Sequence, residues 1–483
     1  MTKVIALLLS YCCFLLPLSG QSSAADLVRD FAARPELRGA AVSISVVEIG
    51  SGRSVADHRA EIAAIPASVT KLITTAAAHD ILGPAYTFRT RLILEGRVHA
   101  GTLRGNLHIV GGGDPTLASP YMSGVIRRGD LLDRWVNAVR KRGIQRIEGQ
   151  VIGDGNYYGT DGAGFAWPWS DLGNYYGAGA YGLNWHENFY FLDLVQRQTV
   201  GAQPLLRGTR PTVQGLTLIN ELVSGPRGSG DQAYIYGAPF NYQHYIRGSI
   251  PVGTSRFTIK GSLPDPALFA AQELNDRLSS GGIVTSSPAF PARIGSVGDY
   301  RQGQVIDELV SPPLTAILER TNMRSNNLYA ETLLREMNKA RGATRATLAG
   351  TEVITNWLYE QGLNVGGVQL EDGSGLSPRN FFSAAFMTDF LLSQADRTQW
   401  RATIPVAGRS GAMRRALKGT VADGRVAAKS GSLDAVRAYA GYIRRTDGQE
   451  LAFAIMVNNY TAEGSRVRAA MLGLMRDLVT APL

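Results

Sequence analysis

The chain has 483 residues, more than one ordinary hydrophobic core supports, so two or three domains are expected. Hydrophobic residues make up 45% of it and charged residues 18%, which excludes an intrinsically disordered protein. The formal net charge is +9, and arginine carries nearly all of the excess because only seven lysines are present. No nucleic-acid motif or dense basic run accompanies this charge. We therefore expect no nucleic-acid partner and favour diffuse, peripheral attraction to an anionic envelope polymer.

The N-terminus is typical of a targeting segment. Lys3 precedes an apolar run over residues 4–18, and small residues follow, with cleavage expected near Ala24 or Ala25. The apolar run is shorter than a membrane span requires. Both cysteines lie in it, so the mature chain is expected to have no disulfide. We expect residues 1–25 to be a signal peptide and the mature protein to be exported to the periplasm.

In the first part of the chain, alternating apolar and small residues predict strands, and a period near 3.6 residues predicts helices. In chain order these are strands at 40–47 and 53–58, a helix at 68–82, strands at 87–94 and 107–110, a helix at 131–142 and a strand at 147–154. Residues 157–190 are crowded with glycine, tryptophan and tyrosine. Two interpretations stay open for them: an irregular loop packed on its own rings, or one wall of a substrate groove. The strand-rich sequence from 189 to about 261 predicts a small β domain.

The later part returns to helices and then to strands. Helices are predicted at 267–280, 309–320, 328–341 and 348–361, strands at 426–429, 436–444 and 451–457, and a last amphipathic helix at 464–478. We expect that last helix to pack on a core, the alternative being a membrane surface. Strands from both ends of the chain can close into one antiparallel sheet flanked by helices. This is an α+β layout interrupted by an inserted middle.

Ser68 and Lys71 stand at the start of the first long helical run, which Gly83 and Pro84 end. Residues three apart share a helix face, and the positive end of the helix favours an oxygen that develops negative charge. A free serine needs an adjacent base, and a desolvated lysine supplies one because burial lowers its pKa. The alternative is an ordinary N-cap serine beside a solvated lysine.

Two later stretches argue for the chemical interpretation. Ser325-Asn326-Asn327 and Lys429-Ser430-Gly431 follow Ser68 and Lys71 in order. Among the seven lysines, only Lys71 has a serine three residues before it, and only Lys429 begins a Lys-Ser/Thr-Gly triplet. With so few lysines, this ordered set argues against a chance match.

The set Ser-x-x-Lys, Ser-x-Asn and Lys-Ser/Thr-Gly resembles that of penicillin-binding proteins and serine β-lactamases. Its order and the long insertion between Lys71 and Ser325 resemble the class C low-molecular-mass penicillin-binding proteins, which are D-alanyl-D-alanine carboxypeptidases/endopeptidases. Further similar stretches lie at 105–107, 113–117, 372–377, 405–408 and 429–433. The resemblance covers nearly the whole mature chain and is weakest over 200–258.

The resemblance implies a β-lactamase/transpeptidase-like domain, an antiparallel sheet flanked by helices, which inserted β-rich domains interrupt. We expect residues 26–96 and 300–483 to form the penicillin-binding domain. Residues 97–195 and 262–299 would form inserted domain II, and residues 196–261 the small β domain III.

The resemblance also implies catalytic roles. Ser68 would attack the carbonyl of a D-Ala-D-Xaa bond and form an acyl-enzyme, with Lys71 taking its proton. Ser325 would relay a proton to the leaving amine, and Asn327 would hold the substrate amide and Lys71. Lys429 would keep the local field positive. Peptidoglycan peptides would be the substrates and β-lactam antibiotics covalent inhibitors.

A second group is expected to bind the substrate. Ser430 and Ser432 would reach its carboxylate, with Gly431 between them in the substrate-binding strand, and the backbone N–H groups of Ser432 and of the nucleophilic serine would form the oxyanion hole. Asp154 matches a family position that can contact a diaminopimelate amino group. Arg379 lies one place beyond a position where relatives often carry a basic residue.

Other classes of site find less support. All six histidines lie between His58 and His244, far from the second and third motifs, and no Gly-x-Ser-x-Gly elbow surrounds Ser68. No His-Glu-x-x-His or cysteine pattern supports a metal, and the chemistry needs no cofactor. A cell-wall-binding scaffold on the same fold stays open as an alternative, as does the oligomeric state. The long insertion argues against a β-lactamase.

Overall fold

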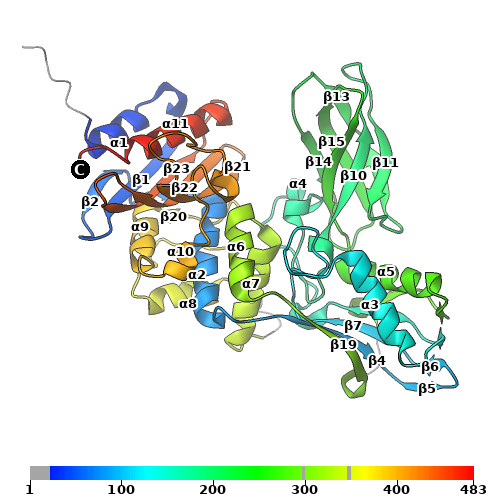
Figure 1. Cartoon of the computed structure of the whole chain (residues 1–483). Coiled ribbons are helices and arrows are strands. Elements are labelled where there is room, and N and C mark those ends of the chain that lie inside the picture. Colours follow the sequence, from blue (N-terminus) through cyan, green and yellow to red (C-terminus); the bar gives the residue numbers. More distant parts are fainter. Residues whose placement is uncertain (1–21, 296–299, 345–349) are drawn as a thin grey trace, which may run out of the picture.

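The computed structural model describes residues 22–295, 300–344 and 350–483 (Figure 1). Residues 1–21, which contain the predicted charged and apolar parts of the signal peptide and both cysteines, lie outside the described residues. None of the described helices is long and apolar enough to cross a membrane. The first helix, α1 (Ala24–Ala32), begins at the expected cleavage position, where the Ser23 side chain and Asp26 form a capping box.

Strands from the two ends of the chain form one antiparallel sheet of five strands. Its order is β2 (Ser54–His58), β1 (Ala41–Glu48), β23 (Glu450–Asn458), β22 (Val436–Arg444) and β21 (Val426–Leu433). The predicted closure of the N-terminal and C-terminal strands is therefore confirmed. The third motif lies on β21, the edge strand.

Both faces of this sheet are covered by helices because its strands are apolar on both sides. Along β23, Ala452, Ala454 and Met456 belong to one hydrophobic core, and Phe453 and Ile455 to the other. The first core contains α2 (Thr70–Leu82) and α9 (Ala384–Ser393), and the second contains α1 and α11 (Gly464–Asp477). Figure 1 shows these helices on opposite sides of the sheet. The last helix thus packs on a core, as expected.

The first motif begins a largely buried helix of this domain. A 3₁₀ turn, η2 (Ala67–Val69), leads into α2, in which every residue from Thr70 to Ala78 is buried. Such a helix lies inside a protein rather than on its surface. Around it stand α6 (Leu314–Arg324), α7 (Asn327–Ala340), α8 (Glu352–Glu360) and α10 (Thr398–Arg401).

The inserted part of the chain forms a second lobe with its own core. A five-stranded sheet runs in the order β18 (Phe290–Pro291), β9 (Val151–Asp154), β7 (Leu107–Gly111), β4 (Arg89–Leu94) and β19 (Gln304–Val310). A four-stranded sheet is built from β17 (Val284–Thr285), β8 (Arg146–Ile147), β6 (Thr102–Arg104) and β5 (Arg97–His99). Two helices, α3 (Arg128–Arg140) and α5 (Pro266–Ser280), pack with these sheets.

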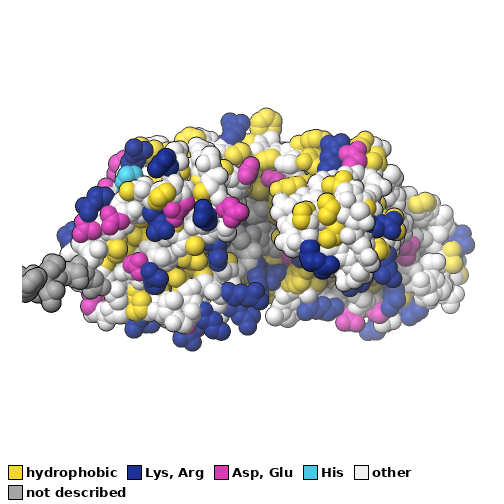
Figure 2. All heavy atoms as spheres, turned by 90° about the horizontal axis from the view of Figure 1, so that it is seen from above, with side chains coloured by type: hydrophobic (Ala, Val, Ile, Leu, Met, Phe, Trp, Pro, Cys, Tyr) yellow, Lys and Arg dark blue, Asp and Glu magenta, His cyan; other side chains and the backbone are white. Residues whose placement is uncertain are grey.

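The segment from 189 to about 261 is rich in strands, as its sequence predicts, and these strands form two small sheets. One contains β11 (Leu205–Arg210), β10 (Phe189–Val195) and β16 (Arg256–Ser262). The other contains β12 (Thr217–Asn220), β13 (Val223–Gly225), β14 (Gln232–Tyr236) and β15 (Gln243–Pro251). Figure 2 shows the molecule from above. Its surface is hollowed between the inserted lobe and the lobe that contains the sheet of the N-terminal and C-terminal strands, and Lys and Arg side chains lie along the hollow.

The expected division into three domains stays a proposal. The expected boundaries at 96/97 and 299/300 assign β4 and β19 to the penicillin-binding domain. However, β4 and β19 pair with each other, and β4 pairs with β7 of the inserted lobe. The two strands therefore carry the chain into and out of the inserted lobe as part of its sheet.

Candidate active site

The two residues of the first motif lie side by side at the start of α2. Lys71 Nζ lies 2.9 Å from Ser68 Oγ, within hydrogen-bond distance. The residue before the serine, Ala67, has a φ of 46°, in the left-handed region that residues other than glycine seldom adopt. Backbone strain of this kind clusters at functional sites, where the surrounding structure holds it in place.

The ammonium of Lys71 is fully buried and makes two further short contacts. Its Nζ lies 2.6 Å from Asn327 Oδ1 and 2.5 Å from the Ser374 carbonyl oxygen. Burial lowers the pKa of Lys71 to about 7, against the opposing effect of the carboxylates of Asp372 and Glu331. Lys71 is therefore partly neutral at neutral pH, which a general base requires.

The three contacts also orient the neutral amine. An amide oxygen and a carbonyl oxygen can only accept hydrogen bonds, so Asn327 and Ser374 take the two N–H groups of a neutral Lys71. Its lone pair is left facing Ser68 Oγ. The geometry thus favours proton transfer from Ser68 to Lys71.

The second motif occupies the junction between α6 and α7, as its sequence predicts. Ser325 ends α6 in the left-handed conformation, with a φ of 55°. Asn326 caps α7, its side chain accepting from the Tyr329 N–H, and Asn327 is the first residue of that helix. Asn327 Nδ2 donates to the Tyr176 carbonyl oxygen at 2.8 Å, which fixes its Oδ1 toward Lys71.

Lys429 of the third motif reaches across to the second. From β21, its buried Nζ lies 2.9 Å from Ser325 Oγ and 2.7 Å from the Ser430 carbonyl oxygen. Burial, and then the charge of Lys71, lower the pKa of Lys429 well below its usual value. Among the described residues, no carboxylate pairs with Lys429 to stabilise its charged form. The expected positive field therefore depends on the carboxylate of an arriving substrate.

Gly431 allows β21 to pass directly over the nucleophile's turn. A Cβ at this position would overlap the Pro66 carbonyl oxygen and would lie 3.1 Å from the Ser68 backbone nitrogen. Glycine in a strand often marks such a close approach. The crossing places Gly431 against the turn that carries Ser68, and the contribution of the next residue, Ser432, to an oxyanion hole stays a prediction.

A loop that sequence reasoning left without a role holds the Ser374 carbonyl in place. The buried Asp372 carboxylate accepts from the backbone N–H groups of Gly375 and Ser377 at 2.6 and 2.7 Å. Glu331, one helical turn after Asn327 on α7, accepts from the Ser374 N–H at 2.8 Å. The only sequence signal was the Asp-Gly-Ser-Gly pattern of the loop, and for Glu331 none was available.

Aromatic residues of the 157–190 segment also reach the site. Trp167 Nε1 donates to Asp372 at 2.8 Å, and the carbonyl of Tyr176 accepts from Asn327. Tyr157 and Tyr158 donate to Glu336 on α7. The segment packs against the catalytic helices, which favours the groove-wall interpretation over a loop packed only on itself.

The two remaining candidates stand apart from the three motifs. Asp154, at the end of β9, is 5% exposed, and its carboxylate accepts from the Asn156 N–H at 2.8 Å. Arg379 is exposed, and its Nε lies 3.7 Å from the Glu371 carboxylate. No contact joins either side chain to the motif residues, so their roles in substrate binding stay predictions. Ser430 is half-buried and Ser432 exposed on β21, where a substrate can reach them.

The geometry can be compared with known proteins. Residues 24–478 match the model of the D-Ala-D-Ala carboxypeptidase 3 (S13) family. The chain belongs to this family. The S13 chain is 28% identical over 443 residues to the D-alanyl-D-alanine carboxypeptidase of Actinomadura sp. strain R39, covering 88% of this chain and 79% of that protein. It is 25% identical over 487 residues to D-alanyl-D-alanine carboxypeptidase DacB of Haemophilus influenzae, covering 96% and 95%.

Solved structures share the fold of this S13 peptidase. Penicillin binding protein 4 from H. influenzae superposes with a TM-score of 0.78 at 24% identity, covering 93% of this chain and 98% of that one. A structure of that protein complexed with a β-lactam gives a TM-score of 0.73 over the same shares. The expected α+β fold and the resemblance to penicillin-binding proteins are thus confirmed. The chain is a serine-type D-Ala-D-Ala carboxypeptidase.

Proposed function

We propose that this chain cleaves D-Ala-D-Xaa bonds of peptidoglycan stem peptides and cross-links through an acyl-enzyme on Ser68, and that β-lactams acylate the same oxygen. The observation that carries the proposal is the position of Lys71, whose Nζ lies within 2.9 Å of Ser68 Oγ, Asn327 Oδ1 and the Ser374 carbonyl.

In the acylation step, Ser68 Oγ attacks the carbonyl carbon while Lys71 Nζ takes its proton. The backbone N–H groups of Ser68 and Ser432 bind the oxyanion, each such donor contributing about 2.7–4 kcal/mol in the transition state. When the C–N bond breaks, the leaving amine takes a proton from Ser325 Oγ. Ser325 regains a proton from the ammonium of Lys71, which returns to its neutral form, while Lys429, 2.9 Å from Ser325 Oγ, holds that hydroxyl in place.

In the deacylation step, a water attacks the ester carbonyl and transfers a proton to the neutral amine of Lys71. The ester bond to Ser68 breaks, Ser68 Oγ takes the proton back from Lys71, and the product departs with its new carboxyl group. A β-lactam forms the same ester but keeps its leaving amine tethered in the opened ring. That tether blocks the water's approach and leaves a long-lived adduct.

We further propose that the protein acts in the periplasm after removal of a signal peptide. The charged and apolar N-terminal run supports export, and peptidoglycan is an envelope polymer. The net charge of +9 suits weak peripheral attraction to anionic envelope components.

Intact-mass spectrometry with benzylpenicillin tests the proposed nucleophile. We expect one adduct of penicillin mass on the wild-type protein, none on Ser68→Ala, and one on Ser51→Ala, which removes an exposed serine in a distant turn. D-Alanine release from a stem pentapeptide should be lost in Ser68→Ala alone. A folded wild-type protein that forms no adduct and releases no D-alanine would contradict the proposal and favour a scaffold. Rapid penicillin turnover with no trapped adduct would indicate a β-lactamase.

A further inference from the structure

A cavity of about 480 Å³ lies beside the second motif. Ser325 and Asn327 line one side of it, and Tyr121, Phe189 and Lys260 from the inserted lobe line the other. Its volume falls in the range of small-ligand pockets. Because Ser325 belongs both to the catalytic centre and to this wall, the cavity continues directly from the place of bond cleavage.

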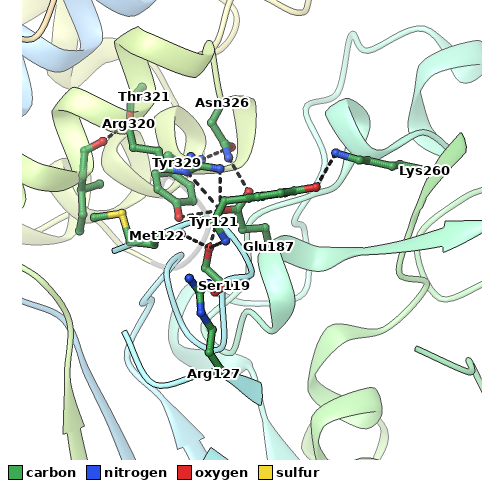
Figure 3. Close-up of polar contacts among 11 residues, drawn as sticks. Ser119, Tyr121, Met122, Arg127, Glu187, Lys260, Arg320, Thr321, Asn326 and Tyr329 are labelled. Carbon is green, nitrogen blue, oxygen red and sulfur yellow. Dashed lines mark hydrogen bonds and ion pairs between the residues drawn. The ribbon is translucent and has the colours of Figure 1, made fainter. Parts of the chain in front are cut away.

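Lys260 is held in this wall by aromatic rings. From β16, its Nζ lies 4.8 to 5.5 Å from the ring centres of Tyr121, Tyr175, Phe189 and Phe191. It donates one hydrogen bond, to Tyr121 Oη at 2.8 Å, and Figure 3 shows the two side chains facing each other. The rings orient and stabilise the ammonium, but they supply no counter-charge. An ammonium has three donors, so two remain for a ligand.

The charges around the cavity do not balance. Its one carboxylate, Glu187, is already paired with Arg320 at 3.2 Å and also accepts from Asn326 at 3.1 Å (Figure 3). Lys260 and Arg324 also line the cavity, and neither pairs with a carboxylate among the described residues. Arg324 is exposed at the end of α6. The cavity therefore presents an excess of positive charge next to Ser325.

Resting on the proposed function, we propose that this cavity binds a carboxylate of the peptide that leaves when a cross-link is cut, with Lys260 and Arg324 as its partners. Ser325 protonates the leaving amine, so the leaving peptide starts at the mouth of the cavity. A released D-alanine has only the carboxylate that the third motif receives. A cross-linked stem peptide extends farther and carries additional free carboxylates, and charge-assisted hydrogen bonds to Lys and Arg suit such groups.

Lys260→Met tests the subsite, because methionine keeps the apolar contacts with the rings and removes the charge. We expect KM for a cross-linked peptide dimer to rise about tenfold, as loss of one charge-assisted contact implies. KM for D-alanine release from the monomeric pentapeptide and the rate of benzylpenicillin acylation should not change. Arg324→Gln should act in the same direction, and Lys260→Arg should restore most of the affinity. Lys141→Met, which removes an exposed lysine of the same lobe, should have no effect.

Three outcomes are decisive in different ways. An equal rise in KM for dimer and pentapeptide would overturn the assignment to the leaving peptide. An unchanged KM for both substrates in Lys260→Met and Arg324→Gln would overturn the anionic subsite. Failure of the wild-type protein to be acylated by benzylpenicillin would instead refute the proposed function, independently of Lys260.

Discussion

At the scale of single residues, Lys71 links burial to reactivity. Apart from Ser68 Oγ, its hydrogen-bond partners are oxygens that can only accept hydrogen bonds, and burial brings its pKa to about 7. Below that pH the amine becomes protonated and loses the lone pair that faces the nucleophile. We therefore expect the second-order rate of penicillin acylation to fall about tenfold per pH unit below pH 7 and to level off above it. Stopped-flow acylation between pH 5 and 8.5 measures this profile.

The comparison variant for this profile is Lys71→Arg. Arginine stays charged throughout this pH range, so it offers no base. We expect its acylation to be lost at every pH, while Lys418→Arg, at an exposed lysine, keeps the wild-type profile. A flat wild-type profile between pH 5 and 8.5 would show that Lys71 does not act as the base.

At the scale of elements, β21 crosses closely over the η2 turn, next to the oxyanion hole that we propose. We expect Gly431→Ala to push the strand away, because the added methyl group would overlap the Pro66 carbonyl oxygen. A displacement of about 1 Å costs roughly 100-fold in rate. Penicillin acylation should fall by that factor, with a loss in unfolding free energy of about 1–3 kcal/mol in denaturant titration. Gly473→Ala, in α11 with open space around it, should be neutral or slightly stabilising. Wild-type acylation by Gly431→Ala would refute the close crossing.

Sequence patterns predicted elements well where periodicity is strong and less well where glycine interrupts it. The helix expected at 68–82 is α2, with its first turn tightened into η2. The strand expected at 426–429 continues to Leu433, because pairing with β22 overrides the weak strand preference of Ser430 to Ser432. Motif order located Ser325 and Lys429, but no local pattern could reveal that their side chains meet.

At the scale of the whole molecule, the inserted lobe contacts the second motif through Glu187. Three consecutive left-handed residues, His186, Glu187 and Asn188, turn the Glu187 carboxylate toward the other lobe. It accepts from Asn326 at 3.1 Å and from Tyr329 at 3.1 Å. No sequence pattern indicates this contact, because the partners are far apart in the chain and a left-handed run of such residues has no recognisable signature.

Glu187 should therefore act as a positioning residue for the second motif. Removing its charge in Glu187→Gln weakens the hold on Asn326 and leaves Arg320 unpaired, so Ser325 is less well fixed opposite Lys429. We expect kcat for D-alanine release to fall about tenfold with KM little changed, and the unfolding free energy to drop by about 1–3 kcal/mol. Glu187→Asp should recover part of kcat. Glu221→Gln, which breaks an exposed ion pair with Arg247 in the same lobe, should change neither quantity measurably. A lower melting temperature with unchanged kcat would mean that Glu187 only joins the lobes and does not position Ser325.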